Sequence, residues 1–266
     1  MSSSGLLDGR RVLVIGASAG IGRAIAVEAL AQGGEVAVVG RRQDRLVEIV
    51  DDKERAIVAD LAVPEDCERL VDEAVKTLGS IDLMVFAAAA SALARLRDAD
   101  VTMWREVLAT NLVAPALVTA AALPHLTSDG FVAFLSSEGV GAPYPGLVPY
   151  TTSKAGLEEL VRGLRAEEPD VRFACVKVGT TDGTEFARSF DPELAAELFP
   201  TWVALGKIPA RMMQPEELGG AILRTLAVAL THPGVDCQDL TFRAPGGPHL
   251  GGIEQLLASV AAAAGS

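Results

Sequence analysis

Short apolar runs rich in valine and isoleucine recur along the chain, separated by longer segments in which apolar residues repeat at helical spacing. Such runs predict buried parallel strands, because a strand covered by helices on both faces has no polar side. Alternation of the two patterns is typical of βαβ units and a parallel sheet. The predicted strands are residues 12–15, 35–39, 56–59, 83–87, 131–135, 171–178 and 239–242.

Proline and acidic residues mark the start of two predicted helices. Pro64 and Pro215 are each followed by two acidic residues, which suits a first helical turn because proline presets φ and carboxylates favour the positive end of the helix dipole. Cys67 falls on the apolar face behind Pro64, so we expect it in the core. Residues 182–213 carry little pattern and are long enough to form a functional lid.

No internal repeat and no break in composition divides the chain. We therefore expect one α/β domain over residues 1–266, a doubly wound Rossmann-type fold with a seven-stranded, mostly parallel sheet flanked by helices. Sheets of this kind bind ligands beyond the carboxyl ends of their strands.

Charge and composition narrow the function classes. The 266 residues include 35 acidic and 23 basic ones, a net charge of −12, so nucleic acids and anionic membranes are not expected partners, because both require a basic surface. Three widely spaced cysteines suit neither a disulfide framework nor a metal site. Residues 111–126 are apolar but contain two prolines, which makes them a weak membrane span. We expect a cytoplasmic protein without a metal.

A glycine-rich turn follows the first predicted strand. Gly16, Gly20 and Gly22 lie between that strand and a helical segment, with Ser18 and Ile21 in the same turn. Glycines at such a junction let a phosphate approach backbone N–H groups and the positive end of the helix dipole. The turn predicts a dinucleotide site; the alternative is an ordinary flexible turn.

Tyr150 and Lys154 are spaced as i and i+4, so on a helix they stand on the same face. An ammonium near a phenol is expected to lower the pKa of the tyrosine from about 10, which suits proton exchange with an alcohol or ketone. The alternatives are a buried tyrosine with a satisfied hydroxyl and a solvated lysine. Tyr144 has a valine four residues later and lacks that assistance.

The second predicted strand ends in Gly40, Arg41 and Arg42. In nicotinamide enzymes an acidic residue at this place binds the ribose 2′-hydroxyl, whereas an arginine accommodates a 2′-phosphate. NADP(H) is therefore favoured over NAD(H), with Arg41 as the first candidate. The alternative is that both arginines are ordinary surface charges.

The glycine spacing Gly-x-x-x-Gly-x-Gly resembles that of the short-chain dehydrogenase/reductase family, and the resemblance extends along the chain. Tyr150 and Lys154 match the family's Tyr-x-x-x-Lys, and Ser137 precedes the tyrosine by 13 residues, as expected when both line one pocket. The resemblance implies that these three and Asn111 are catalytic, with Ser137 bonding the substrate oxygen and Asn111 holding a water that links Lys154 to solvent. Ser136 is the rival of Ser137, and only the offset separates them.

The resemblance also implies a set of cofactor contacts. Asp60 follows the third strand, where the family's aspartate contacts the adenine, and Lys154 would bind the nicotinamide ribose. Thr181 or Thr184 would touch the nicotinamide amide. The expected cofactor-binding residues are Gly16, Ser18, Gly20, Ile21, Gly22, Arg41, Arg42, Asp60, Leu61, Ala87, Tyr150, Lys154 and Thr181.

The chain departs from the family after the fourth strand, where Asn-Asn-Ala-Gly is replaced by Phe-Ala-Ala-Ala at residues 86–89. This loses side-chain hydrogen bonds that brace the sheet, which affects sheet detail or stability rather than the chemistry. After the sixth strand the family's Pro-Gly is Val178-Gly179.

We interpret the sequence as an NADP(H)-dependent oxidoreductase that transfers a hydride between the nicotinamide and a small-molecule carbonyl or secondary alcohol. The resemblance implies a homodimer or homotetramer. One alternative is a catalytically silent NADP(H)-binding regulatory protein of the same fold, supported by residues 86–89. Another is a nucleotide-sugar epimerase, which the glycine spacing disfavours. Large apolar residues in the lid predict a hydrophobic or bulky substrate, unless they only pack the lid onto the body.

Overall fold

The computed structural model describes residues 5–247, so both ends of the expected domain, residues 1–4 and 248–266, lie outside the described residues. Its centre is a seven-stranded sheet in the order β3-β2-β1-β4-β5-β6-β7, and all six pairings are parallel. The strands are β1 (Arg11–Ile15), β2 (Glu35–Gly40), β3 (Ala56–Val58), β4 (Ile81–Phe86), β5 (Leu126–Ser137), β6 (Arg172–Val178) and β7 (Asp239–Phe242). All seven predicted strands are confirmed, and β5 begins at Leu126 rather than at residue 131.

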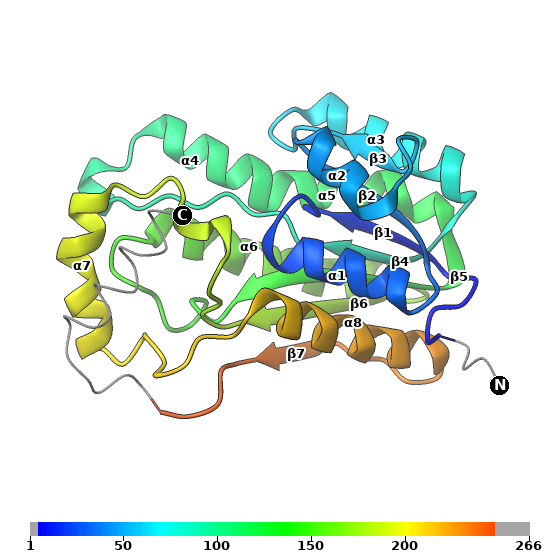
Figure 1. Ribbon diagram of the computed structural model, residues 1–266. Helices are drawn as coiled ribbons and strands as arrows, with labels where there is room; N and C mark the ends of the chain where they lie inside the picture. The colour runs from blue at the N-terminus through cyan, green and yellow to red at the C-terminus, as the bar shows by residue number, and fades with distance from the viewer. Residues whose placement is uncertain (1–4, 248–266) are drawn as a thin grey trace.

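Helices cover both faces of the sheet, as a doubly wound fold requires (Figure 1). The helices predicted to start at Pro64 and Pro215 are confirmed. One face carries α1 (Gly20–Ala31), α2 (Gln43–Val50) and α8 (Pro215–Thr231), and the other carries α3 (Pro64–Leu78), α5 (Ala114–Ala122) and α6 (Val148–Glu167).

The central strands are apolar at successive positions because both of their faces are covered. In β1, Val12 and Val14 pack with α1 and α8, whereas Leu13 and Ile15 pack against the helices of the opposite face. This alternation follows from the two-residue repeat of a strand. Cys67 lies fully buried in the second of these layers, as the helical pattern predicted.

The helix α4 (Val101–Leu108) runs through a π-helical turn, Ala109–Val113, into α5. The combined stretch Val101–His125 is the one candidate membrane span among residues 5–247 by length and composition. In this fold its Ala114, Val118 and Ala122 are buried in the core between the sheet and α3. A core helix of a folded domain has the same apolar character.

The Phe-Ala-Ala-Ala stretch leaves the sheet intact. β4 pairs with both β1 and β5 over Leu83–Phe86, and the Ala87 amide donates to the Ile15 carbonyl at 2.8 Å. Phe86 packs 6.4 Å from the Phe134 ring on the neighbouring strand. Apolar packing therefore stands where the family has side-chain hydrogen bonds.

The expected lid contains a 3-10 turn, Glu185–Ala187, and α7 (Pro192–Ala204). Figure 1 shows α7 at the left of the molecule, beyond the strands of the sheet. Leu198, Phe199 and Trp202 of α7 form a third apolar cluster with Leu147 and Tyr150 of the body. Much of the aromatic surface of the lid thus packs it onto the body.

Candidate active site

Tyr150 lies in the first turn of α6, facing the carboxyl end of β5. Pro149 suits this turn because its missing N–H would have no helical partner there. Tyr150 is 8% exposed. Burial raises the pKa of Tyr150 to about 12, while an interaction with the Ser137 hydroxyl acts in the opposite direction. The phenol is therefore neutral at physiological pH.

The structure separates the two candidate serines at the end of β5. Ser137 lies at the Tyr150 hydroxyl, and its own oxygen accepts a bond from the Gly139 amide at 3.1 Å. Ser136 points to the other side of the strand, where it donates to Glu158 at 2.7 Å. Neighbouring residues in a strand face opposite sides, so only one of them can reach the tyrosine.

Lys154 is buried and turned toward the sheet. Its Nζ donates to the Leu135 carbonyl at 2.8 Å. Burial lowers the pKa of Lys154 to about 8. The prediction that this lysine lowers the pKa of Tyr150 is wrong for this geometry, because desolvation of the phenol is the largest effect and raises its pKa instead.

Asn111 lies in the π-helical turn that interrupts the long helix. Its amide accepts from the Ala90 N–H at 2.7 Å and donates to the Ala90 carbonyl at 2.8 Å and to the Ser153 hydroxyl at 2.9 Å. Ser153 in turn donates to the Tyr150 carbonyl at 2.7 Å. Asn111 therefore ties the strand end after β4 to the helix that carries Tyr150.

The glycine-rich turn has the shape of a phosphate cradle. Gly16 has a φ of +88°, and a Cβ there would lie 2.5 Å from the Ala88 amide nitrogen. A Cβ on Gly22 would lie 2.3 Å from the Gly16 carbonyl oxygen. The helix α1 begins at Gly20, so its free N–H groups face the turn. Side chains at Gly16 and Gly22 would collide with the protein's own backbone, so the tight turn requires glycine, and the N–H groups at the start of α1 suit a dinucleotide's phosphates.

The two arginines at the end of β2 differ in orientation. Arg41 is exposed. Arg42 turns back over the glycine-rich turn and donates to the Ser18 hydroxyl at 3.0 Å. Arg45, in the first turn of α2, points to the same place and shares the partner Glu185 with Arg42. Sequence reasoning missed Arg45, although its spacing of three residues from Arg42 is a helical signal.

The remaining predicted contacts lie at the carboxyl ends of three other strands. After β3, Asp60 is exposed and its carboxylate accepts from the Ala62 amide at 3.0 Å, while Leu61 is half-buried. Ala87 follows β4 directly. After β6, the Thr181 hydroxyl donates to the Gly179 carbonyl at 3.0 Å. Of the two threonines, Thr184 is the one beside the glycine-rich turn, 3.5 Å from the Cβ position of Gly20.

The sequence profile described as short chain dehydrogenase matches residues 10–195, which is more than half of the chain. The chain belongs to the short-chain dehydrogenase family. It is 32% identical over 229 residues to dehydrogenase/reductase SDR family member 4 of Bos taurus, covering 81% of this chain and 80% of that protein. Proteins of this family are oxidoreductases that bind a nicotinamide cofactor, as the resemblance implied.

Solved structures agree with the fold. A dehydrogenase/reductase from Sinorhizobium meliloti 1021 superposes with a TM-score of 0.74 at 27% identity, covering 90% of this chain and 96% of that one. A short chain dehydrogenase from Burkholderia cenocepacia J2315 in complex with NADP has a TM-score of 0.74 at 25% identity, covering 89% and 97%. The Rossmann-type architecture of this chain is therefore shared with solved relatives.

One polar residue that sequence reasoning missed is Glu138, next to Ser137. Its carboxylate accepts from the Thr180 amide at 3.1 Å and from the Tyr144 hydroxyl at 3.2 Å. The Lys207 carbonyl lies 3.0 Å from the same Tyr144 hydroxyl, so the two acceptors share its single proton. Glu138 thus joins the ends of β5 and β6 to the loop before α6 and to the lid. The sequence signal that could have identified Glu138 is its position directly after Ser137.

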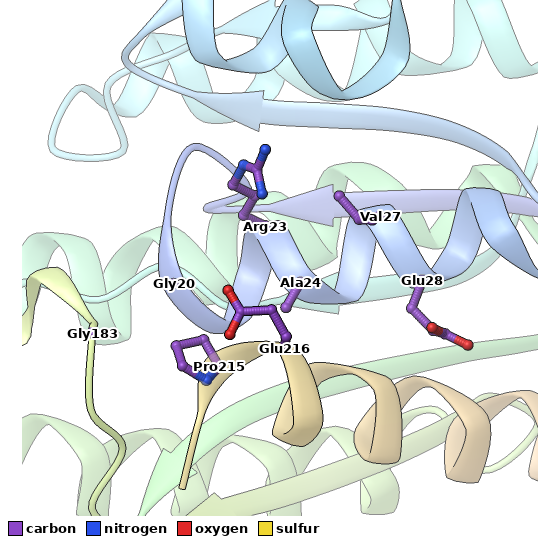
Figure 2. Close-up of a pocket in the computed structure, with 8 residues that line it drawn as sticks. All are labelled: Gly20, Arg23, Ala24, Val27, Glu28, Gly183, Pro215 and Glu216. Atoms are coloured by element: carbon purple, nitrogen blue, oxygen red, sulfur yellow. The ribbon is translucent and has the colours of Figure 1, made fainter.

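A cavity of about 160 Å³ lies on the outer side of α1, against the start of α8 (Figure 2). It meets the glycine-rich turn only at Gly20 and contains neither Tyr150 nor Ser137. It is therefore separate from the catalytic candidates. Its lining residues are Gly20, Arg23, Ala24, Val27, Glu28, Gly183, Pro215 and Glu216.

Among residues 5–247, no group of three His, Cys, Asp or Glu side chains is placed to hold a metal.

Proposed function

We propose that this protein is an NADP(H)-dependent oxidoreductase that transfers a hydride between the nicotinamide and a carbonyl or secondary alcohol. The proposal is carried by the arrangement of Ser137 at the carboxyl end of β5, Tyr150 in the first turn of α6 and the glycine-rich turn that opens α1. A substrate oxygen between the Ser137 and Tyr150 hydroxyls would receive two hydrogen bonds and have a proton donor within reach.

The cofactor, when bound, supplies or accepts the hydride. The glycine-rich turn and the first turn of α1 would hold its phosphates. Lys154 would bind its nicotinamide ribose, and Arg42 together with Ser18 would bind a 2′-phosphate. Asp60, Leu61, Ala87 and Thr181 lie at strand ends along the same edge. Asn111 acts on Tyr150 through Ser153, because the hydrogen bonds of these residues fix the helix that carries the phenol.

In the reductive direction Tyr150 acts as the proton donor. With a pKa of about 12 the phenol is neutral, so it can donate a proton to the oxygen of a carbonyl that accepts a hydride. Ser137 would hold that oxygen as the charge develops. Removing a proton from an alcohol would instead require the phenolate form of Tyr150, which a nearby positive charge such as that of Lys154 stabilises.

The charge at the end of β2 supports NADP(H) over NAD(H). Gly40 carries no carboxylate for a 2′-hydroxyl, and the Arg42 guanidinium lies over Ser18. We assign the phosphate contact to Arg42 rather than Arg41, because Arg41 is exposed. The Burkholderia relative was solved with NADP.

A catalytically silent NADP(H)-binding regulatory protein is the second candidate. It is favoured by one observation: the Phe186 ring of the lid packs 4.9 Å from the Tyr150 ring, edge to face, where a substrate would approach. In that case the protein would bind the cofactor without turnover.

Following NADPH absorbance with a panel of hydrophobic ketones, aldehydes and quinones tests the proposal. We expect turnover, and Tyr150→Phe should reduce it by at least about 100-fold, because general acid–base catalysis contributes that much. Cofactor affinity, measured by calorimetry, should stay within a few-fold.

Tyr144→Phe is the matched control, since Tyr144 is the second tyrosine of the chain and lies outside the hydroxyl pair. Its turnover should stay close to that of wild type. A Tyr150→Phe variant that keeps more than about a tenth of the wild-type rate contradicts the assignment. Tight NADPH binding with no turnover of any compound favours the regulatory candidate.

We also propose a cytoplasmic homodimer or homotetramer acting on a hydrophobic carbonyl compound. The net charge of −12 disfavours an anionic membrane as the setting, and the half-buried Phe186 beside Tyr150 supports the substrate class. Light scattering tests the assembly, and a molar mass equal to that of one 27.6 kDa chain would contradict it.

A further inference from the structure

Three consecutive lid residues contact three different parts of the candidate site. Thr184 lies against the glycine-rich turn at Gly20. Glu185 pairs with arginines at the end of β2. Phe186 packs on the Tyr150 ring. One short segment therefore closes over the phosphate cradle, the end of β2 and the proton donor together.

Glu185 is held by several cations. Arg42 donates to both of its carboxylate oxygens, at 2.6 and 2.8 Å, in a bidentate pair. Arg45 donates at 3.1 Å, and Arg188 lies 3.5 Å away on the lid itself. The arginine beside it lowers the pKa of the Glu185 carboxyl, so this side chain is an anion at neutral pH.

The carboxylate lies where the proposed cofactor would place its own anion. Arg42 bonds Ser18 and Glu185 with the same guanidinium, so both partners meet at the end of β2 above the glycine-rich turn. Planar guanidinium groups bind carboxylates and phosphates by the same paired hydrogen bonds. Three arginines around one carboxylate leave an excess of positive charge, which suits a dianion better than Glu185.

We propose that Glu185 is an internal competitor of the cofactor's 2′-phosphate and so a residue that sets cofactor specificity. This inference rests on the proposed NADP(H) function. Binding of NADPH displaces the carboxylate from Arg42 and Arg45, and that displacement lowers the net affinity. NADH has no group at this position and leaves the ion pairs in place.

The position of Phe186 links this exchange to the substrate site. Because it directly follows Glu185, release of the carboxylate frees the segment that holds the Phe186 ring on Tyr150. NADPH would thereby expose the proton donor, whereas NADH would leave it covered. The ion pairs of Glu185 thus hold this segment against the site until the phosphate displaces them.

The test is calorimetric titration of wild type and Glu185→Gln with NADPH and with NADH at low ionic strength. We expect the variant to bind NADPH about three- to tenfold more tightly, since a partly exposed bidentate pair is lost as a competitor. NADH affinity should change less than about twofold. Glu193→Gln, in the first turn of α7, removes the same charge from the lid outside this cluster and should change neither affinity.

Amide hydrogen exchange adds a readout that does not depend on turnover. Residues 183–190 should exchange faster in Glu185→Gln, and in wild type NADPH but not NADH should produce the same increase. Unchanged NADPH affinity in the variant, with wild type still preferring NADPH, overturns the competitor role and leaves the proposed function standing. Weaker NADPH binding by Glu185→Gln would show that Glu185 orients the arginines for the phosphate, and this result would also overturn the competitor role. A wild type that binds NADH as tightly as NADPH overturns both proposals.

Discussion

At the scale of single residues, burial controls the two ionisable groups of the proposed catalytic pair. Tyr150 and Lys154 are both desolvated, so the charged form of each is disfavoured: the pKa of the phenol is raised to about 12 and that of the ammonium is lowered to about 8. Lys154 keeps its charge near neutral pH with one backbone carbonyl as its hydrogen-bond partner. The folded protein therefore holds a cation at a cost in stability.

Lys154→Met is expected to reveal that cost. The lysine has a pKa of about 8 when folded and about 10.4 when unfolded, so between these values the unfolded chain binds more protons and stability rises with pH. The free energy of unfolding of the variant, relative to wild type, should fall by on the order of 2–3 kcal/mol from pH 7 to pH 10. Urea denaturation across this range measures it.

Lys76→Met, on the exposed side of α3, serves as the control. The difference in free energy of unfolding between this variant and wild type should stay constant with pH. A constant difference for Lys154→Met as well would mean that burial does not perturb this lysine.

At the scale of elements, contact between α1 and α8 positions the phosphate cradle. A Cβ on Gly219 of α8 would lie 2.5 Å from the Ala24 Cβ and 2.9 Å from the Ile25 amide nitrogen of α1. The helices approach this closely because Gly219 has no side chain. Since α1 begins at the glycine-rich turn, its position against α8 also places the N–H groups that would meet the phosphates.

Gly219→Ala should destabilise the protein by about 1–3 kcal/mol, the usual effect of overpacking, and should weaken cofactor binding as α1 shifts. Gly220→Ala is the matched control, because its Cβ would come no closer than 3.7 Å, to the Glu28 carboxylate. On helix propensity alone the free energy of unfolding of Gly220→Ala should rise by up to about 1 kcal/mol. Chemical denaturation and cofactor titration of both variants give the comparison, and equal stability of the two would contradict tight helix contact.

At the scale of the whole molecule, one buried carboxylate joins three strands at the amino end of the sheet. Asp82, in β4, accepts bonds from the Arg11 amide at 2.8 Å and its Nε at 2.7 Å in β1, and from Thr127 at 3.1 Å in β5. Burial by itself would raise the pKa of Asp82, but the hydrogen bonds and charge of Arg11 outweigh it and the pKa is lowered. This network lies at the end of the sheet opposite to Tyr150.

Asp82→Asn should reduce the free energy of unfolding by about 2–4 kcal/mol at pH 7, because it removes the charged partner of a buried pair. The folded pKa of Asp82 lies below its unfolded value, so its contribution is present above about pH 4 and is lost as pH falls through the folded pKa. Wild type and variant should therefore converge in stability at low pH. Cofactor affinity should be unchanged.

The exposed Asp72→Asn on α3 provides the comparison for this change. A gap between Asp82→Asn and wild type that persists below the folded pKa would contradict a role for the charge.

The sequence by itself determined the order and type of the elements and the short-range pairs. All seven strands, the helices at Pro64 and Pro215 and the glycine-rich turn follow from local periodicity and turn chemistry. Such features depend on neighbours a few residues away. For the choice between Ser137 and Ser136 the sequence offered only the 13-residue offset from Tyr150, and the structure separates the two because neighbouring strand residues face opposite sides.

Only the tertiary structure decided the direction of the charged side chains. Arg42 meets Glu185 across 143 positions of sequence, and Lys154 turns to the Leu135 carbonyl rather than to the phenol. The rotamer of a long side chain depends on the partners and the solvent exposure that the folded chain provides. The same burial that the apolar pattern predicted also reversed the expected pKa shift of Tyr150, because desolvation depends on how many distant segments cover a group.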